Sequence, residues 1–196
     1  MVDLADGVMI LLLACTGYGL GCVNTGYYLV LWRTGQDLRT LGSGNAGARN
    51  TGRILGKAGF VAALLGDVLK GVIPVATARW LGLPEWAWFV VLFATLAGHL
   101  WPWQLQGRGG KGAATSLGGV LAISPAAGGI ALLTLILLRW PTQRTVLSGA
   151  LGAALIPPAA WLLGGSPTVL AGFTLLLLVL VYTHRENLRR VVGGGE

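Results

Sequence analysis

The chain has 196 residues, of which 54% are hydrophobic and 11% are charged, whereas soluble domains carry roughly 25% charged residues. This composition leaves too little polar surface for a water-soluble globule and predicts an integral membrane protein. Basic residues outnumber acidic ones by 14 to 7, and the positive bias of cytoplasmic loops explains this excess without a nucleic-acid partner.

Several apolar segments reach the length of about 20 residues that a transmembrane helix needs. In chain order they are 8–32, 57–81, 86–105, 145–163 and 168–183. A further uncharged stretch, 112–138, is long enough for one tilted helix or for two short helices. Two helices would meet at Ser124-Pro125, because proline disfavours continuation of a helix.

The placement of the basic residues favours two short helices. With seven spans, 12 of the 14 basic residues lie on one side of the membrane, whereas six spans divide these 12 seven to five. Because cytoplasmic loops are rich in Lys and Arg, we predict an all-α integral membrane protein with seven transmembrane helices, two of them short. The N-terminus is expected outside and the C-terminus in the cytoplasm, with one polytopic domain over residues 1–196.

The first predicted inner loop, 33–53, is rich in glycine and contains a GxGxxG pattern. No strand precedes this pattern, so it does not predict a dinucleotide site. The glycines can still let backbone N–H groups approach an anion. The candidate side chains for such a site are Ser43, Asn45, Arg49 and Arg53. The alternative is a flexible loop whose basic residues only orient the chain.

The second predicted inner loop ends in a glycine-rich run that opens directly into an apolar helix. Lys111 stands at the start of that helix, where free N–H groups and the helix dipole favour a phosphate. The Walker A pattern is missing, because Leu105 and Gly112 occupy positions that require glycine and Ser or Thr. The glycines of this candidate anion site are Gly107, Gly109, Gly110 and Gly112.

Earlier in the same region, His99 is interpreted as a buried, hydrogen-bonded histidine at a helix end, with a role as ligand or base as the alternative. Asp67 and Lys70 are three residues apart and should pair as a structural support, because isolated charges inside a membrane are costly. His184 and Asn187 share a face at the inner end of the last helix. There they are candidate site residues, with an interfacial stop-transfer cluster as the alternative.

Four motifs occur in the order and spacing of one family. They are GSGNAGARN with Arg53, DVLKG at 67–71, GHLWP leading into GGKGAAT, and HREN at 184–187. The chain resembles the acyl-phosphate:glycerol-3-phosphate acyltransferases, the PlsY family of seven-helix bacterial inner-membrane enzymes with a cytoplasmic active site. The resemblance implies transfer of a fatty acyl group from acyl phosphate to the sn-1 hydroxyl of glycerol 3-phosphate in phospholipid biosynthesis. The products are lysophosphatidic acid and phosphate, and no metal or other cofactor is implied.

The resemblance also implies which residues form the site. The loop 107–112 matches the family's phosphate loop, and the polar active-site positions correspond to Ser43, Arg53, Lys111, His184 and Asn187. The chain departs from the family pattern at Arg49, Gly107 and Leu147, where threonine, an aromatic residue and serine are usual. The neighbouring Ser148 lies on a different helix face from Leu147.

As a mechanistic hypothesis, Lys111 and the N–H groups of 109–112 hold the acyl-phosphate head. Glycerol 3-phosphate is assigned to Arg53, Ser43, Asn187 and Arg49. Either His184 or the substrate's own phosphate takes the hydroxyl proton. A covalent acyl-enzyme on Ser43 is the weaker option, because no adjacent base is evident.

We expect a monomer surrounded by membrane lipids. Two other functions remain open on the sequence alone, a transporter of a phosphorylated metabolite and a divergent, non-catalytic lipid-binding protein. Carriers place their substrate sites near the membrane midplane, where this chain offers only Asp67 and Lys70.

Overall fold

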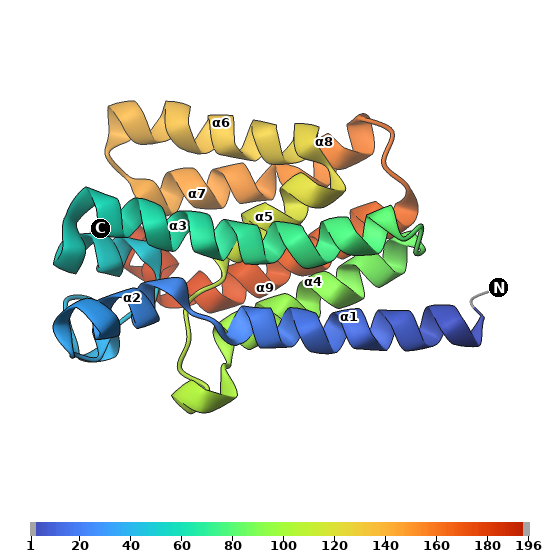
Figure 1. Cartoon of the computed structure of the whole chain (residues 1–196). Coiled ribbons are helices and arrows are strands. Elements are labelled where there is room, and N and C mark those ends of the chain that lie inside the picture. Colours follow the sequence, from blue (N-terminus) through green and yellow to red (C-terminus); the bar gives the residue numbers. More distant parts are fainter. Residues whose placement is uncertain (1–2, 194–196) are drawn as a thin grey trace. The chain divides into compact units, whose positions relative to one another are not determined.

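The computed structural model describes residues 3–193, which form nine α-helices and two short 3₁₀ turns (Figure 1). The chain divides into two compact units, Met1–Gly119 and Val120–Glu196, and each is described by itself. The first unit contains α1 (Leu4–Cys22), α2 (Thr25–Thr34), η1 (Leu38–Thr40), α3 (Ala48–Trp80), α4 (Glu85–Leu100) and η2 (Trp103–Leu105). Helix α5 (Ala113–Ile123) crosses the boundary, and the second unit continues with α6 (Pro125–Thr142), α7 (Thr145–Ala154), α8 (Ile156–Leu162) and α9 (Pro167–Val192).

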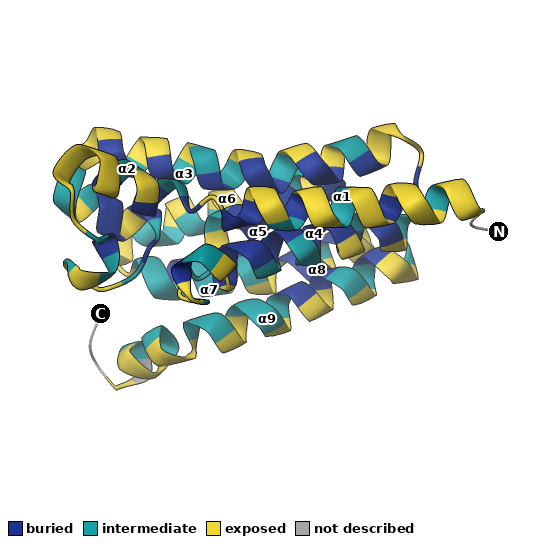
Figure 2. Cartoon of the chain, turned by 60° about the horizontal axis from the view of Figure 1, so that its bottom comes forward, coloured by how far each residue is buried: buried dark blue, intermediate teal, exposed yellow. Residues whose placement is uncertain are grey.

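Five helical stretches among the described residues are long and apolar enough to cross a bilayer. They are Leu4–Thr34, Ala48–Trp80, Pro125–Thr142, Thr145–Leu162 and Pro167–Val191. Figure 2 shows long exposed faces on α1 and α9, and exposed leucines and valines are numerous on these stretches. Apolar side chains that face outward in this way suit contact with lipid rather than water.

The predicted break at Ser124-Pro125 is confirmed. Ser124 caps α6 by accepting a hydrogen bond from the Ala127 N–H on its Oγ, at 3.4 Å, and Pro125 occupies the first helical position. A proline is favourable there because the first N–H groups of a helix have no partner inside the helix. Helices α5 and α6 are therefore separate.

Other predicted spans differ from the structure in their continuity and length. The segment 8–32 is interrupted at Val23-Asn24, and 145–163 is interrupted just before two consecutive prolines. The span 86–105 was predicted too long, because α4 ends at Leu100 and the chain turns at Pro102. The last helix continues past the apolar span 168–183 and carries the HREN motif on its final turns, as predicted.

Glycines set the packing in the first unit, where α1 lies along α4 (Figure 1). A Cβ atom at Gly98 would overlap the Tyr18 carbonyl oxygen, and one at Gly21 would overlap the Thr95 carbonyl oxygen. Such close backbone approach through small residues is typical of membrane helices. This close packing fixes the end of α4, and the second loop, residues 101–112, begins directly after it.

Helix α3 is kinked at Gly56, whose φ of 71° and ψ of −166° are non-helical. This backbone region is open essentially to glycine alone. The kink separates a short basic segment that starts at Ala48 from the long apolar remainder of the helix. It also brings Phe60 against Gly52, where a Cβ atom would lie 2.8 Å from the Phe60 Cβ.

Lys70 stabilises the break between α1 and α2. Its Nζ donates hydrogen bonds to the carbonyl oxygens of Gly21 (3.1 Å) and Val23 (2.8 Å), and lies 3.0 Å from an Asp67 carboxylate oxygen. Both charged side chains are at least 95% buried. The predicted pair is therefore present, and the ammonium also serves carbonyl groups that the end of α1 leaves without helical partners.

The second unit is built on α6 and α7, which pack against each other at small residues. A Cβ atom at Gly152 of α7 would lie 2.5 Å from the Ala131 carbonyl oxygen of α6. Helix α9 packs against α7 and α8. Its last turns carry the polar residues of the HREN motif.

We predict that Lys70→Met destabilises the protein by about 3–5 kcal/mol, because it leaves the Asp67 charge buried without its partner. The double variant with Asp67→Leu removes that charge but still leaves the α1 carbonyls without a donor, so it should recover only part of the loss. Lys57→Met, an exposed lysine on the same helix, serves as control and should change stability by about 0.5 kcal/mol or less. Thermal unfolding in one detergent measures all three. A double variant as stable as the wild type would show that Lys70 serves only to pair Asp67.

Candidate functional site

The first loop, residues 35–47, is organised by Asn50, which is buried near the start of α3. The Asn50 Nδ2 donates to the carbonyl oxygens of Leu41 (2.9 Å) and Leu38 (3.2 Å), and its Oδ1 accepts the Ser43 N–H (2.9 Å). Gly42 has a φ of 54°, and a Cβ atom there would overlap the Asn50 Oδ1. The amide thus shapes the turn that leaves the predicted site residue Ser43 exposed. Sequence analysis missed Asn50, and its place within the glycine motif was the only signal.

Arg39 connects the first loop to the second loop, residues 101–112. Its guanidinium pairs with Asp37 at 2.6 Å, donates to the Leu105 carbonyl oxygen at 2.8 Å, and lies over the Tyr27 ring at 5.2 Å. The hydrogen bonds from Arg39 lower the pKa of the Asp37 carboxyl below its usual value. The pair therefore stays ionised at neutral pH.

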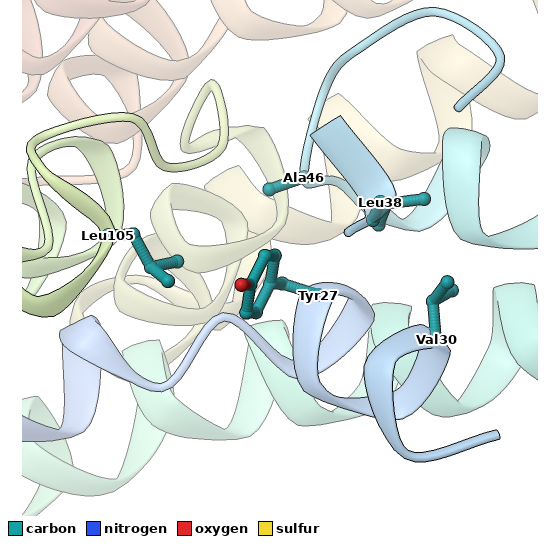
Figure 3. Packing of buried hydrophobic residues seen from close by; sticks show 5 residues of the cluster. All are labelled: Tyr27, Val30, Leu38, Ala46 and Leu105. Carbon is teal, nitrogen blue, oxygen red and sulfur yellow. The ribbon is translucent and has the colours of Figure 1, made fainter. Parts of the chain in front are cut away.

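An apolar cluster supports the same connection. Figure 3 shows the Tyr27 ring of α2 among residues from both loops, and the cluster consists of Tyr27, Val30, Leu38, Ala46 and Leu105. All five side chains are buried. The two glycine-rich loops are therefore held on a common apolar base rather than flexible relative to each other.

An open pocket of about 300 Å³ lies beside the kink of α3. Three of its residues are cations spaced four residues apart, Arg49, Arg53 and Lys57, and the others are Gly52, Gly56 and Phe60. Three positive charges around one pocket suit a phosphate group. Arg49 and Arg53 were predicted, whereas Lys57 was counted only among the charges that orient the chain. The predicted Asn45 is half-buried beside Gly47, the residue that precedes α3.

The glycines of the second loop were predicted to let an anion approach their backbone, but the N–H groups of Gly109 and Gly110 form hydrogen bonds within the protein. The Gly109 N–H donates to the Leu100 carbonyl oxygen (3.1 Å) and the Gly110 N–H donates to the His99 carbonyl oxygen (3.1 Å). A Cβ atom at either position would overlap His99. These two glycines permit close packing on the end of α4, and their N–H groups are already engaged in holding the loop.

The start of α5 is the remaining candidate anion site in this loop. Lys111 is half-buried immediately before it, and Gly112 turns the chain into the helix with a φ of 86°. The first N–H groups of a helix lack helical partners and attract anions. Gly107, with a φ of 72°, directs its N–H to the Pro102 carbonyl oxygen at 3.0 Å and so belongs to the turn rather than to this N-terminus.

His99 is buried at the end of α4, as predicted, but among the described residues its Nδ1 has no hydrogen-bond partner, so the predicted hydrogen bond is not present at this nitrogen. Its Nδ1 lies 3.9 Å from an Asp67 carboxylate oxygen, and its ring packs against Gly110. The histidine therefore lies between the buried ion pair of α3 and the second loop. Among residues 3–193, no three His, Cys, Asp or Glu side chains are grouped so that they could hold a metal ion.

In the second unit, His184 and Asn187 are three residues apart on α9 and both are half-buried. The His184 Nδ1 lies 3.0 Å from the Leu180 carbonyl oxygen. A proton on Nδ1, donated to this carbonyl, makes Nε2 the nitrogen that carries the lone pair. The Ser148 hydroxyl is buried and donates to the Arg144 carbonyl oxygen of its own helix at 2.7 Å.

Comparison with known proteins identifies close relatives over the full length of the chain. Residues 11–194 match the glycerol-3-phosphate acyltransferase family. The chain is 42% identical over 192 residues to glycerol-3-phosphate acyltransferase 1 of Desulfitobacterium hafniense, covering 95% of this chain and 92% of that protein. It is 40% identical over 191 residues to glycerol-3-phosphate acyltransferase of Pseudomonas aeruginosa PAO1, covering 96% and 98%.

The structure is similar to two crystal structures of PlsY, an integral membrane glycerol 3-phosphate acyltransferase. Its glycerol 3-phosphate form superposes with a TM-score of 0.90 at 31% identity, covering 96% of this chain and 94% of that chain. The lysophosphatidic acid form gives a TM-score of 0.88 at 30% identity over the same shares. The protein is thus an all-helical, multi-pass integral membrane protein, and it belongs to the glycerol-3-phosphate acyltransferase family.

Proposed function

We propose that this protein, a glycerol-3-phosphate acyltransferase that forms lysophosphatidic acid, takes its acyl group from acyl phosphate and releases inorganic phosphate. The supporting observation is the presence of two cationic sites in the first unit. One is the pocket of Arg49, Arg53 and Lys57, and the other is Lys111 at the start of α5. Both substrates of this reaction carry a phosphate, so two anion sites are what the chemistry requires.

The pocket on α3 is assigned to glycerol 3-phosphate. A phosphate monoester carries close to two negative charges at neutral pH, and Arg53 with Arg49 and Lys57 can neutralise them. Ser43 and Asn45 in the first loop add hydroxyl and amide groups that can bind the glycerol part. Arg49 replaces a threonine of the family pattern and strengthens the positive charge of the pocket.

The acyl-phosphate head is assigned to Lys111 and the first turn of α5. The lysine charge and the helix dipole stabilise the phosphate as it leaves with an additional negative charge. Gly109 and Gly110 hold the loop in place, and Gly112 gives the phosphate access to the helix N-terminus. The acyl chain would lie along apolar helix faces in contact with lipid.

His184 is assigned to the proton of the sn-1 hydroxyl, and Asn187 to orienting the same substrate. The hydroxyl oxygen forms an ester bond with the acyl carbon as the bond from that carbon to the phosphate oxygen breaks. The proton passes to the His184 Nε2 or, in the alternative route, to the phosphate. In either route the acyl group needs no further activation, because the phosphate is already a leaving group.

We also propose that the single-domain chain crosses the bacterial inner membrane seven times as a monomer, with both loops on the cytoplasmic face. Seven spans would place 12 of the 14 basic residues on one side, and this distribution supports the orientation. In a variant without Cys15 and Cys22, Gln36→Cys should react with a membrane-impermeant maleimide only in inside-out vesicles, and Leu163→Cys only in intact cells. Labelling of Gln36→Cys in intact cells would refute the orientation.

The purified protein in lipid nanodiscs should convert acyl phosphate and glycerol 3-phosphate into equal amounts of lysophosphatidic acid and phosphate. Lys111→Ala should lower kcat/KM by about 10²–10³-fold, in the range of losing one group that stabilises transition-state charge. Arg108→Ala removes an exposed cation from the same loop and should leave the rate within a few-fold. An inactive wild type that instead carries a phosphate ester into proteoliposomes would support the transporter.

His184→Ala should lower kcat by about 10²–10⁴-fold, the usual contribution of a general base, and should remove the acidic limb of the pH profile of kcat. Arg185→Ala, on the adjacent exposed position, is the matched control and should change kcat little. A high residual rate with an unchanged pH profile would instead assign the proton to the substrate phosphate.

A further inference from the structure

Asn24 occupies the break between α1 and α2, and its side chain is fully buried. Its Nδ2 donates to the Cys22 carbonyl oxygen at 3.4 Å, and its Oδ1 accepts the Gly110 N–H at 3.2 Å. Each end of the amide therefore has a suitable partner, because Nδ2 donates to a carbonyl oxygen and Oδ1 accepts an N–H. The bond to Gly110 spans 86 positions of the chain and joins the first membrane helix to the second loop.

Gly110 is the residue immediately before Lys111, and it is held from two sides. Its N–H is shared between the Asn24 Oδ1 and the His99 carbonyl oxygen, at 3.2 and 3.1 Å. The His99 ring also packs so closely on Gly110 that a Cβ atom there would overlap it. The backbone that leads into Lys111 therefore has one position fixed by buried partners.

The contact with Gly110 is the distinctive contribution of Asn24, because other side chains already serve the end of α1. Lys70 donates to the Gly21 and Val23 carbonyl oxygens. Gln104 donates to the Cys22 carbonyl oxygen at 2.8 Å, a shorter bond than the one from Asn24. Gln104 thus shares the carbonyl partner of Asn24 and forms no hydrogen bond with Gly110.

We propose that Asn24 is a positioning residue for the acyl-phosphate site. By holding the Gly110 N–H it fixes the backbone before Lys111, and so it places the ammonium group and the first turn of α5 for the acyl-phosphate head. Asn24 touches no substrate in this role. The inference rests on the proposed role of Lys111, and it concerns the acyl donor rather than glycerol 3-phosphate.

The test compares Asn24→Leu, Asn24→Asp and Gln104→Leu in steady-state kinetics with both substrates varied. Asn24→Leu should lower kcat/KM for acyl phosphate by about 10²-fold, the cost of a small misplacement of a reacting group, while the KM for glycerol 3-phosphate stays within a few-fold. Asn24→Asp keeps an acceptor for the Gly110 N–H but loses the donor to the Cys22 carbonyl oxygen, so it should recover part of the loss. Gln104→Leu should remain within a few-fold of the wild type.

Equal losses of kcat/KM in Asn24→Leu and Gln104→Leu would overturn the proposal. The effect would then come from disturbing the α1–α2 break in general and not from the hydrogen bond to Gly110. A folded Asn24→Leu with wild-type kcat/KM would also overturn the proposal. Should Asn24→Leu fail to fold, Asn24→Ser carries the same expectation, since its hydroxyl is too short to reach Gly110. A wild type that forms no lysophosphatidic acid would refute the proposed function, whereas active wild type together with active Asn24→Leu would refute only the positioning role.

Discussion

The buried ammonium group of Lys70 is the interaction on which the first unit depends. A charge within a membrane helix is tolerated only when its hydrogen bonds and its counter-charge are supplied, and here Asp67 and two carbonyl groups at the end of α1 supply them. The same contacts allow the first membrane helix to end at Cys22 and restart at Thr25 without exposing backbone polar groups to lipid. The break in turn places Asn24 where it can hold the second loop.

Glycine serves two different purposes in the proposed site. At Gly42 and Gly56 the positive φ values are required by a turn and a kink, and these shape the loop of Ser43 and the basic pocket. At Gly109 and Gly110 the missing Cβ permits contact with His99. The proposed anion-binding groups are therefore cationic side chains and the start of α5, and the N–H groups of Gly109 and Gly110 are used to hold the loop.

Features that depend on neighbouring residues in the chain were predictable from the sequence, whereas contacts between distant segments were not. The break at Ser124-Pro125 follows from proline alone, and the pairing of Asp67 with Lys70 follows from the cost of burying a charge. The break at Asn24 has no such local signal, since it depends on donors from α3 and from the second loop. Likewise, the glycine run before the helix and the family resemblance both pointed to Lys111, but the use of the glycine N–H groups before it became evident only once their partners were known.

The central claim is that the α1–α2 break and the glycine loop before Lys111 form one hydrogen-bonded unit. Hydrogen–deuterium exchange in lipid nanodiscs tests it directly, with the wild type compared to Lys70→Gln, which removes the charge and retains a polar side chain. Exchange should become faster both in the peptide 21–28 and in the peptide 105–113. An increase confined to 21–28, with 105–113 unchanged, would contradict the account.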